Sequence, residues 1–434
     1  MIDNYPPVYP LLVAGIGAAT NLPLMQVGRA ISVLAGLIAG MLVGMFVWRL
    51  TGRRYSTVLA AGLFLGNLYV LVWAPLARAD MLGLTFSLAG LWLVYRWWRS
   101  WLTLSLAILC LVAAVYTRQS YALAAPVASV TWLWHNDRRK GVWFAATLLL
   151  LSASLFLLMN ALTSGGFYLN TVLVYTVHSY QVRRAAAMLR GLLVVWPAVV
   201  AVAGVAIVGT FFKSYGSINE TSGQGRQPFV VYGLMPYTLG ALISVPAAGK
   251  IGSDVNYLLE PIAAPAIWAA LGVAWWPGWR RLRQHHAILL LTGQVIIMLF
   301  LGGTVSRLQA ADKWARIGEY DRVFRHVQAA AQRGPILADE YLGMVVRAGH
   351  PIYYQSFDYQ QLYLTGHWDP GQLISEIKAR KFPLIMLTGR GRPVFSERWD
   401  PSFVGAIDQN YTPSETLGEL VLYEPLKASE GGSR

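Results

Sequence analysis

The segment GKIGSDVNYLLEP, at residues 249–261, brings several polar side chains to the edge of an apolar run. Lys250 has glycines close by on both sides, and glycines allow backbone N–H groups to approach an anion. Lysine is also a point-charge partner for phosphate. Asn256 and Glu260 are four residues apart, which places them on one face of a helix. These residue types predict a site for an anionic ligand, while Tyr257 also suits the aromatic belt at a membrane surface.

Charged residues border two other apolar runs. In APLARADMLG, Arg78 and Asp80 precede a run that begins near Met81, and in YTRQSY, Arg118 follows one. A capping role explains Asp80, because aspartate is favoured at a helix N-terminus, but it leaves Arg78 unexplained. Contact with lipid headgroups explains Arg118 as well as a functional role does. At membrane edges a charged residue is costly, so a functional role stays open for each.

The elements that position these residues are apolar. Of the 434 residues, 56% are hydrophobic and 13% are charged, and the mean hydropathy is +0.46. A soluble domain carries about twice this charged fraction. The net charge of +14 comes from short basic clusters between apolar runs, so it indicates membrane topology rather than a nucleic-acid partner. The composition predicts a protein surrounded by membrane lipid.

Apolar runs long enough to cross about 30 Å of hydrocarbon recur up to residue 305. We expect about ten transmembrane helices, at 27–48, 56–74, 81–95, 101–116, 121–135, 142–162, 190–212, 228–247, 256–276 and 286–305. Alternate loops carry most of the basic residues, among them Arg138 and Arg280, so the positive-inside rule places those loops in the cytoplasm. Asp80, Lys250 and the chain after residue 305 are then expected outside it.

The composition changes after residue 305, where most of the acidic residues lie. Helical patterns alternate there with strand-like segments, which is typical of a small α/β domain. We expect helices at 309–332 and 370–380 and strands at 335–340, 351–354 and 383–388. The predicted fold is an all-α polytopic membrane protein with a small C-terminal α/β soluble domain. Its parts are an outer-surface proline-rich and in-plane segment at 1–26, a transmembrane domain at 27–305 and an extracytoplasmic domain at 306–434.

The first 135 residues resemble a known family. The features that carry the resemblance are YPPVYPLL at 5–12, GRA at 28–30, WRLTGRR at 48–54 and ARADMLGLTFSLAGLWLVYR at 77–96. They are similar to bacterial relatives of the dolichyl-phosphate-mannose protein mannosyltransferases and the aminoarabinose lipid A transferases, which are plasma-membrane glycosyltransferases of the GT-C fold. The resemblance implies a GT-C-like fold and transfer of a sugar, with inversion, from a polyprenyl-phosphate donor. It does not identify the acceptor, which could be a lipid, a glycan or a protein.

The resemblance also implies catalytic residues. The family uses an aspartate on its first outer loop as general base, and Asp3 is the acidic residue in the corresponding region here. That loop normally follows a first transmembrane helix, which this chain lacks, so we expect the sequence to be truncated or to start differently. Asp80 matches an aspartate that the family carries at the top of a later span. Asp80 and Asp3 are therefore the expected catalytic residues, and Asp80 could also hold a divalent metal ion, the one cofactor considered.

The expected substrate-binding residues surround a departing phosphate, which cations stabilise. They are Tyr5, Pro7, Tyr9, Arg78, Arg118, Lys250, Asn256, Tyr257 and Glu260. We expect the group from the 249–261 segment to lie close to Arg78 and Asp80 in space. The prolines of YPPVYPLL oppose a helix there, and this stretch is expected to pin a short in-plane helix that shapes the cavity.

Two other functions fit the same composition. A transporter or flippase of lipid-linked sugars would also have many spans and outward cations, but it would more often show repeated halves with broken helices at the midplane, and we find no such repeat. An inactive accessory membrane protein is favoured by the missing first helix. A further span upstream, followed by an aspartate in a short loop, would favour the enzyme.

The charge bias generates a prediction about sidedness. Reporter proteins fused at residue 320 and at residue 138 are expected to report opposite sides of the membrane, with residue 320 outside the cytoplasm. The measurement is the activity of a fused periplasmic reporter at each position. The same readout from both fusions would contradict the expected topology.

Overall fold

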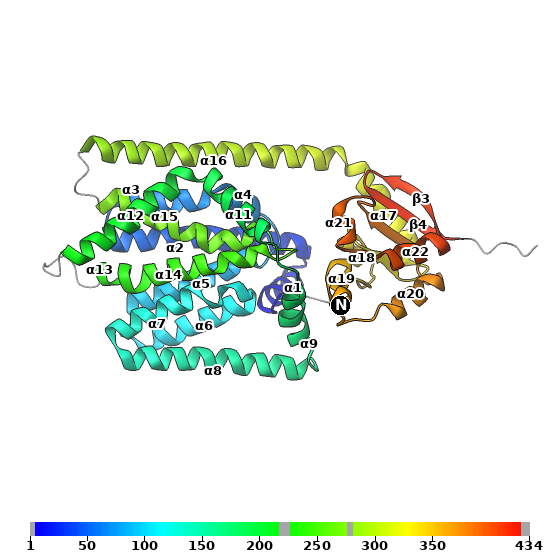
Figure 1. Cartoon of the computed structure of the whole chain (residues 1–434), viewed down its shortest axis with the longest axis horizontal. Helices are drawn as coiled ribbons and strands as arrows, with labels where there is room; N and C mark the ends of the chain where they lie inside the picture. Colours follow the sequence, from blue (N-terminus) through cyan, green and yellow to red (C-terminus); the bar gives the residue numbers. More distant parts are fainter. Residues whose placement is uncertain (1–4, 217–225, 276–280, 427–434) are drawn as a thin grey trace, which may run out of the picture. The chain divides into compact units, whose positions relative to one another are not determined.

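The computed structural model describes residues 5–216, 226–275 and 281–426 (Figure 1). The expected catalytic residue Asp3 and the basic residue Arg280 lie outside these ranges. The chain divides into two compact units. The helical unit consists of Tyr5–Phe167 and Ser179–Arg307, and the C-terminal unit contains Tyr168–His178 and the chain from Leu308.

The helical unit is a bundle whose elements follow one another with short connections. Its helices are α1 (Val8–Thr20), α2 (Leu24–Thr51), α3 (Arg54–Leu65), α4 (Leu68–Trp73), α5 (Asp80–Trp97), α6 (Trp101–Thr117), η1 (Gln119–Ala122), α7 (Ala124–Asn136), α8 (Arg138–Leu162), α11 (Val182–Val195), α12 (Pro197–Gly216), α13 (Arg226–Phe229), η3 (Val230–Leu234), α14 (Met235–Ser244), η4 (Val245–Gly249), η5 (Val255–Leu258), α15 (Leu259–Trp275) and most of α16 (Arg281–Ala315).

Helix α15 forms the centre of the bundle. In the most apolar 18 residues of Val255–Trp275, 89% of the residues are buried, whereas the corresponding share in Arg138–Leu162, at one edge of the bundle in Figure 1, is 11%. Alanines recur along α15, and small residues let neighbouring helices approach closely. The helix packs against α2, α3 and α12. Its central place matters for the site, because Asn256 and Tyr257 lie just before its first turn.

The structure agrees with the predicted membrane fold class. Within the described residues, five helices are long and apolar enough to cross a membrane, or six if α11 and α12 form one bent span. They are Leu24–Thr51, Arg138–Leu162, Val230–Gly249, Val255–Trp275 and His285–Ala315. Of the other expected spans, 56–74 and 190–212 are interrupted, 101–116 and 121–135 correspond to helices of 17 and 13 residues, and 81–95 corresponds to the 18-residue α5, so the expected ten long helices are not all found.

Two interruptions have clear local causes. The expected span at 56–74 is broken between α3 and α4, where the Asn67 side chain accepts a hydrogen bond from the backbone N–H of Tyr69 and caps α4. The expected span at 190–212 bends by 94° between α11 and α12. Pro197 begins α12, and its ring cannot continue the preceding helix.

The proline-rich start is more helical than expected. Helix α1 begins at Val8 and contains Tyr9 and Pro10. The first turn of a helix has no intrahelical partners for its backbone N–H groups, so Pro7 just before the helix and Pro10 in its first turn are tolerated. The expectation that these prolines exclude a helix was wrong for the second half of YPPVYPLL.

The C-terminal unit is a small α/β fold. Its elements include η2 (Leu169–Leu173), α10 (Val174–Val177), α17 (Ile317–Ala331), β1 (Ile336–Ala338), α18 (Leu342–Arg347), α19 (Ser356–Leu364), α20 (Gly371–Lys378), β2 (Leu384–Thr388), α21 (Pro393–Ser396), α22 (Pro401–Asn410), β3 (Tyr411–Leu417) and β4 (Leu420–Pro425), while the short α9 (Gly166–Tyr168) lies at its boundary. The sheet order is β1-β2-β4-β3, with β1 and β2 parallel and the other pairs antiparallel.

The predicted strands β1 and β2 and the predicted helix α20 are confirmed. The strand expected at 351–354 is wrong, because this stretch has no regular structure. Its buried Tyr354 packs against the rings of Trp399 and Tyr359 instead. The hairpin of β3 and β4, which turns at Gly418 with a φ of 61°, was not anticipated.

A segment from the middle of the sequence belongs to the C-terminal unit. His178 Nε2 lies 3.1 Å from Asp358 Oδ1, and Val174 packs against Leu362. The next residues return to the helical unit, where Ile251 N donates to Ser179 O at 2.9 Å. The chain therefore passes from one unit to the other at the peptide bond between His178 and Ser179, and the next residue, Tyr180, pairs with Lys250.

Close helix packing generates a stability prediction. A Cβ atom at Gly240 of α14 would lie 2.7 Å from the Ala124 Cα of α7. Gly240→Ala is therefore expected to lower the free energy of unfolding by about 1–3 kcal/mol, as overpacking does. The measurement is thermal unfolding of the detergent-purified protein. The control is Gly204→Ala, where nothing lies within 4 Å of the added atom, and equal unfolding temperatures for the two variants would contradict the packing argument.

Candidate functional site

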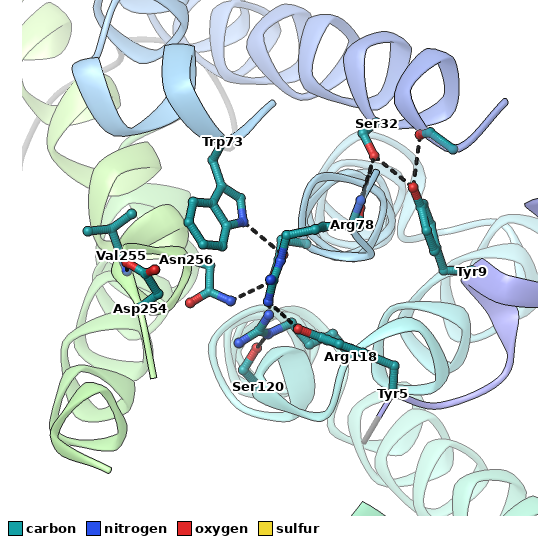
Figure 2. A network of polar contacts seen from close by, with 12 residues as sticks. Tyr5, Tyr9, Ser32, Trp73, Arg78, Arg118, Ser120, Asp254, Val255 and Asn256 are labelled. Atoms are coloured by element: carbon teal, nitrogen blue, oxygen red, sulfur yellow. Dashed lines mark hydrogen bonds and ion pairs between the residues drawn. The ribbon is translucent and has the colours of Figure 1, made fainter. Parts of the chain in front are cut away.

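Asp80 is the hub of a polar network in the helical unit. Figure 2 shows its partners Trp73, Arg78, Arg118 and Asn256. Its carboxylate is fully buried at the first residue of α5. Trp73 Nε1 donates to Oδ2 at 2.8 Å, Arg78 Nε donates to Oδ2 at 3.2 Å, and Asn256 Nδ2 donates to Oδ1 at 3.0 Å. Arg118 forms an ion pair with Oδ1. Buried charges need partners of this kind, and each of these partners comes from a different part of the bundle.

These contacts decide between the two interpretations of Asp80. The residue before α5 is Ala79, which has no side chain that could cap the helix, and the carboxylate of Asp80 bonds to other side chains. The capping interpretation therefore does not account for Asp80. The backbone is fixed as well, because the hydroxyl of Tyr121 donates to the Asp80 carbonyl at 2.8 Å.

The donors around Asp80 do not suit a metal ion. Divalent cations such as Mg²⁺ and Ca²⁺ need oxygen ligands, but the groups on this carboxylate are two guanidiniums, an indole N–H and an amide N–H. Across the described residues, no group of three or more histidine, cysteine or acidic side chains could hold a metal. The residues present do not fit the divalent ion considered for Asp80.

The two guanidinium groups differ in access. The Arg118 side chain is 3% exposed, its Nε donates to Ser120 Oγ at 3.0 Å, and its Cζ lies 4.7 Å from the centre of the Tyr257 ring. The Arg78 side chain is 38% exposed. Since two cations share a single carboxylate, the network carries a net positive charge, and Arg78 is its accessible part. This arrangement can bind an anion.

The start of the chain supports Arg78 from one side. The Tyr5 hydroxyl accepts a hydrogen bond from Arg78 Nη2. The Tyr9 hydroxyl donates to Gly28 O at 2.8 Å and lies 3.0 Å from Ser32 Oγ, which donates to the Arg78 carbonyl at 2.9 Å. The proline-rich segment thus holds Tyr5 against the guanidinium and ties α1 to α2. Tyr9 itself is buried, so it supports the network rather than lining an open surface.

Asn256 presents an unused acceptor beside Asp80. Its Nδ2 must face the carboxylate, because the amide nitrogen is the donor, and this fixes the orientation of the group. Its Oδ1 is then buried with no hydrogen-bond partner among the described residues. A buried acceptor in this position can receive a hydroxyl from a ligand or a water molecule.

The loop that carries Lys250 is organised differently from the expectation. Lys250 pairs with Tyr180 in an antiparallel bridge, Lys250 N donates to Ala247 O at 3.3 Å, and Ile251 N donates to Ser179 O at 2.9 Å. The backbone N–H groups of Lys250 and Ile251 are therefore occupied, and the binding of an anion by the Lys250 side chain stays a prediction. Gly249 is required because a Cβ there would lie 2.6 Å from the Tyr180 ring.

The expected residues fall into three groups. Tyr5, Arg78, Asp80, Arg118, Asn256 and Tyr257 are joined by direct contacts, and Tyr9 is linked to them through Ser32. Pro7 lies at the N-terminal boundary of α1, Glu260 bonds to Ser87, and Lys250 is not among the contacts of Asp80. The close approach of Asn256 to Asp80, expected from their polar character at helix ends, is confirmed.

Sequence reasoning missed four members of the network: Ser32, Trp73, Ser120 and Tyr121. Ser120 and Tyr121 belong to YTRQSY beside Arg118, so the segment itself was a signal. Trp73 stands in an apolar run and is one of 17 tryptophans, which the composition assigns to the membrane belt. Trp73 differs from an ordinary belt tryptophan only in that its indole N–H donates to the buried carboxylate of Asp80, which the sequence does not show.

No family model and no curated protein matches the sequence. Two solved structures, however, are similar to this chain. ArnT from Cupriavidus metallidurans bound to undecaprenyl phosphate is similar with a TM-score of 0.60 and 13% identity, over 98% of this chain and 88% of that chain. The apo state of ArnT gives a TM-score of 0.62 and 12% identity, over 97% and 88%. The chain has the GT-C fold of ArnT. This confirms the fold that the resemblance implied.

The unequal exposure of the two arginines generates a prediction. Arg118→Ala leaves a buried carboxylate short of its buried cation, which costs about 3–5 kcal/mol of stability. Arg78→Ala removes a cation that water partly solvates, which costs about 0–1 kcal/mol. The measurement is the unfolding of both purified variants in parallel. Equal losses would contradict the division into a buried anchor and an accessible cation.

Proposed function

We propose that the protein is a plasma-membrane glycosyltransferase that moves a sugar from a polyprenyl-phosphate donor to an acceptor outside the cytoplasm. The observation that carries the proposal is the Asp80 network, in which two guanidiniums share one buried carboxylate and leave a net positive charge. It is supported by the shared fold with ArnT, whose structure holds undecaprenyl phosphate.

In this proposal Arg78 receives the phosphate of the donor. When the bond between the sugar C1 and the phosphate oxygen breaks, negative charge grows on the departing polyprenyl phosphate. A guanidinium already held in place stabilises that charge at no cost of reorganisation during the reaction. Asp80 and Tyr5 orient the Arg78 group, and Arg118 adds a second positive charge behind it.

Asp80 itself is a poor candidate for the general base. Its two oxygens already accept hydrogen bonds or ion pairs from four side chains, so no lone pair is directed to an incoming hydroxyl. We assign it instead to positioning the cations. Asp3, two residues before Tyr5 in the sequence, takes the proton of the acceptor hydroxyl in this proposal, as that oxygen bonds to the sugar C1 with inversion.

The sugar has its own contacts in this arrangement. Asn256 Oδ1 is an acceptor with no partner among the described residues, so it suits a sugar hydroxyl. The ring of Tyr257 stacks on Arg118 and is only partly buried, which leaves part of it for the ligand. Hexoses and pentoses both carry such hydroxyls, so the transferred sugar is a hexose or a pentose in this proposal. The acceptor is a lipid, a glycan or a protein.

The proposal is tested by transfer from labelled donors. Membranes that contain the full protein are incubated with undecaprenyl phosphates that carry different radiolabelled sugars, and the label that leaves the lipid is counted. Arg78→Ala is expected to reduce transfer by about 10²–10³-fold, since it removes a preorganised contact to the leaving group. Its unfolding temperature should stay close to that of the unaltered protein.

The matched control is Arg29→Ala, which removes an exposed arginine of α2 outside the network and should leave transfer unchanged. A donor panel on which the unaltered protein releases no label would refute the glycosyltransferase proposal. Near-normal transfer by Arg78→Ala would keep the activity but reject the role of Arg78.

A further inference from the structure

Glu260 is a carboxylate buried in the centre of the helical bundle. It lies in the first turn of α15 and is 4% exposed. Its Oε1 accepts a hydrogen bond from Ser87 Oγ at 2.9 Å, and Ser87 is fully buried in α5. An ionisable side chain inside an apolar helix costs free energy, so its presence calls for a task.

Two side-chain hydrogen bonds join the same pair of segments. Asn256 bonds to Asp80 at 3.0 Å, and Glu260 bonds to Ser87 at 2.9 Å. Glu260 lies one helical turn beyond Asn256, and Ser87 lies two turns beyond Asp80. The two bonds therefore fix both the rotation and the axial position of α15 relative to α5, because one bond alone would leave the helix free to pivot.

Few backbone contacts join α5 directly to α15. Helix α15 packs closely against α2, α3 and α12, and α5 packs closely against α2 and α6. Between α5 and α15 the long side chain of glutamate spans the gap to Ser87. An alanine or a shorter polar residue at position 260 would not reach, so the residue type matches the distance to be bridged.

We propose that Glu260 is a positioning residue: through Ser87 it sets α15 against α5 and so holds Asn256 against Asp80. It acts as a hydrogen-bond acceptor and touches no substrate. The effect on sugar transfer rests on the proposed function, in which Asn256 and the Asp80 network contact the donor. This role replaces the expectation that Glu260 binds substrate.

The proposal is tested with Glu260→Ala, Glu260→Gln and Ser87→Ala. Glu260→Ala and Ser87→Ala are each expected to lower kcat by about 10–100-fold, the cost of a small misplacement, with the KM for the lipid donor within about twofold. Glu260→Gln keeps an acceptor oxygen at the same place and should restore most of kcat. Ser129→Ala, which removes another fully buried serine hydroxyl from α7, is the control and should leave kcat unchanged.

A glutamate that binds substrate would give a different pattern. Ser87→Ala would then be nearly neutral, and Glu260→Gln would raise the KM. A merely structural role would lower the unfolding temperature while the folded protein kept its kcat. Either pattern would overturn the proposal.

Unfolding supplies a readout that needs no sugar transfer. If Glu260 and Ser87 act as one unit, the loss of unfolding temperature in Glu260→Ala/Ser87→Ala is smaller than the sum of the two single losses. This coupling is expected even if the unaltered protein transfers no sugar, an outcome that would reject the proposed function alone. Additive losses would reject the positioning role.

Discussion

The buried carboxylate of Asp80 is the constraint on which the helical unit depends. A charge without solvent must be matched by donors, and here they come from the end of α4, from the chain just before α5, from the residue after α6 and from η5. Three separate stretches of sequence, at 73–80, 118 and 256, therefore have to converge on the two carboxylate oxygens. The arrangement of the bundle around α5 can be understood as the geometry that satisfies this requirement.

The same constraint makes the site useful for binding. A carboxylate that holds two guanidiniums leaves a net positive charge and fixes the direction of both groups before any ligand arrives. Preorganised donors of this kind are stronger toward an anion than mobile surface cations, because their order is already built into the fold. In the proposed function, stability and binding thus use the same contacts, with Arg118 serving mainly the first and Arg78 mainly the second.

The sequence predicted the fold class, the small C-terminal α/β domain and most members of the network, because charge at the edge of an apolar run is a strong signal. It could not show that α3 and α4 are separate helices or that the chain bends sharply between α11 and α12, since these breaks depend on local capping and on Pro197. It also could not separate Trp73 from the other tryptophans, or predict that Glu260 faces Ser87. Glu260 and Ser87 are 173 residues apart, so only tertiary packing determines their contact, and the bond from Trp73 to Asp80, although local, depends on the turn between α4 and α5.

The most direct test of the account is a structure of the full protein with undecaprenyl phosphate. The account predicts phosphate oxygens within hydrogen-bonding distance of the Arg78 guanidinium, with Asp80 still bound to Arg78, Arg118 and Asn256. A phosphate held elsewhere in the bundle, with Arg78 making no contact to it, would contradict the account.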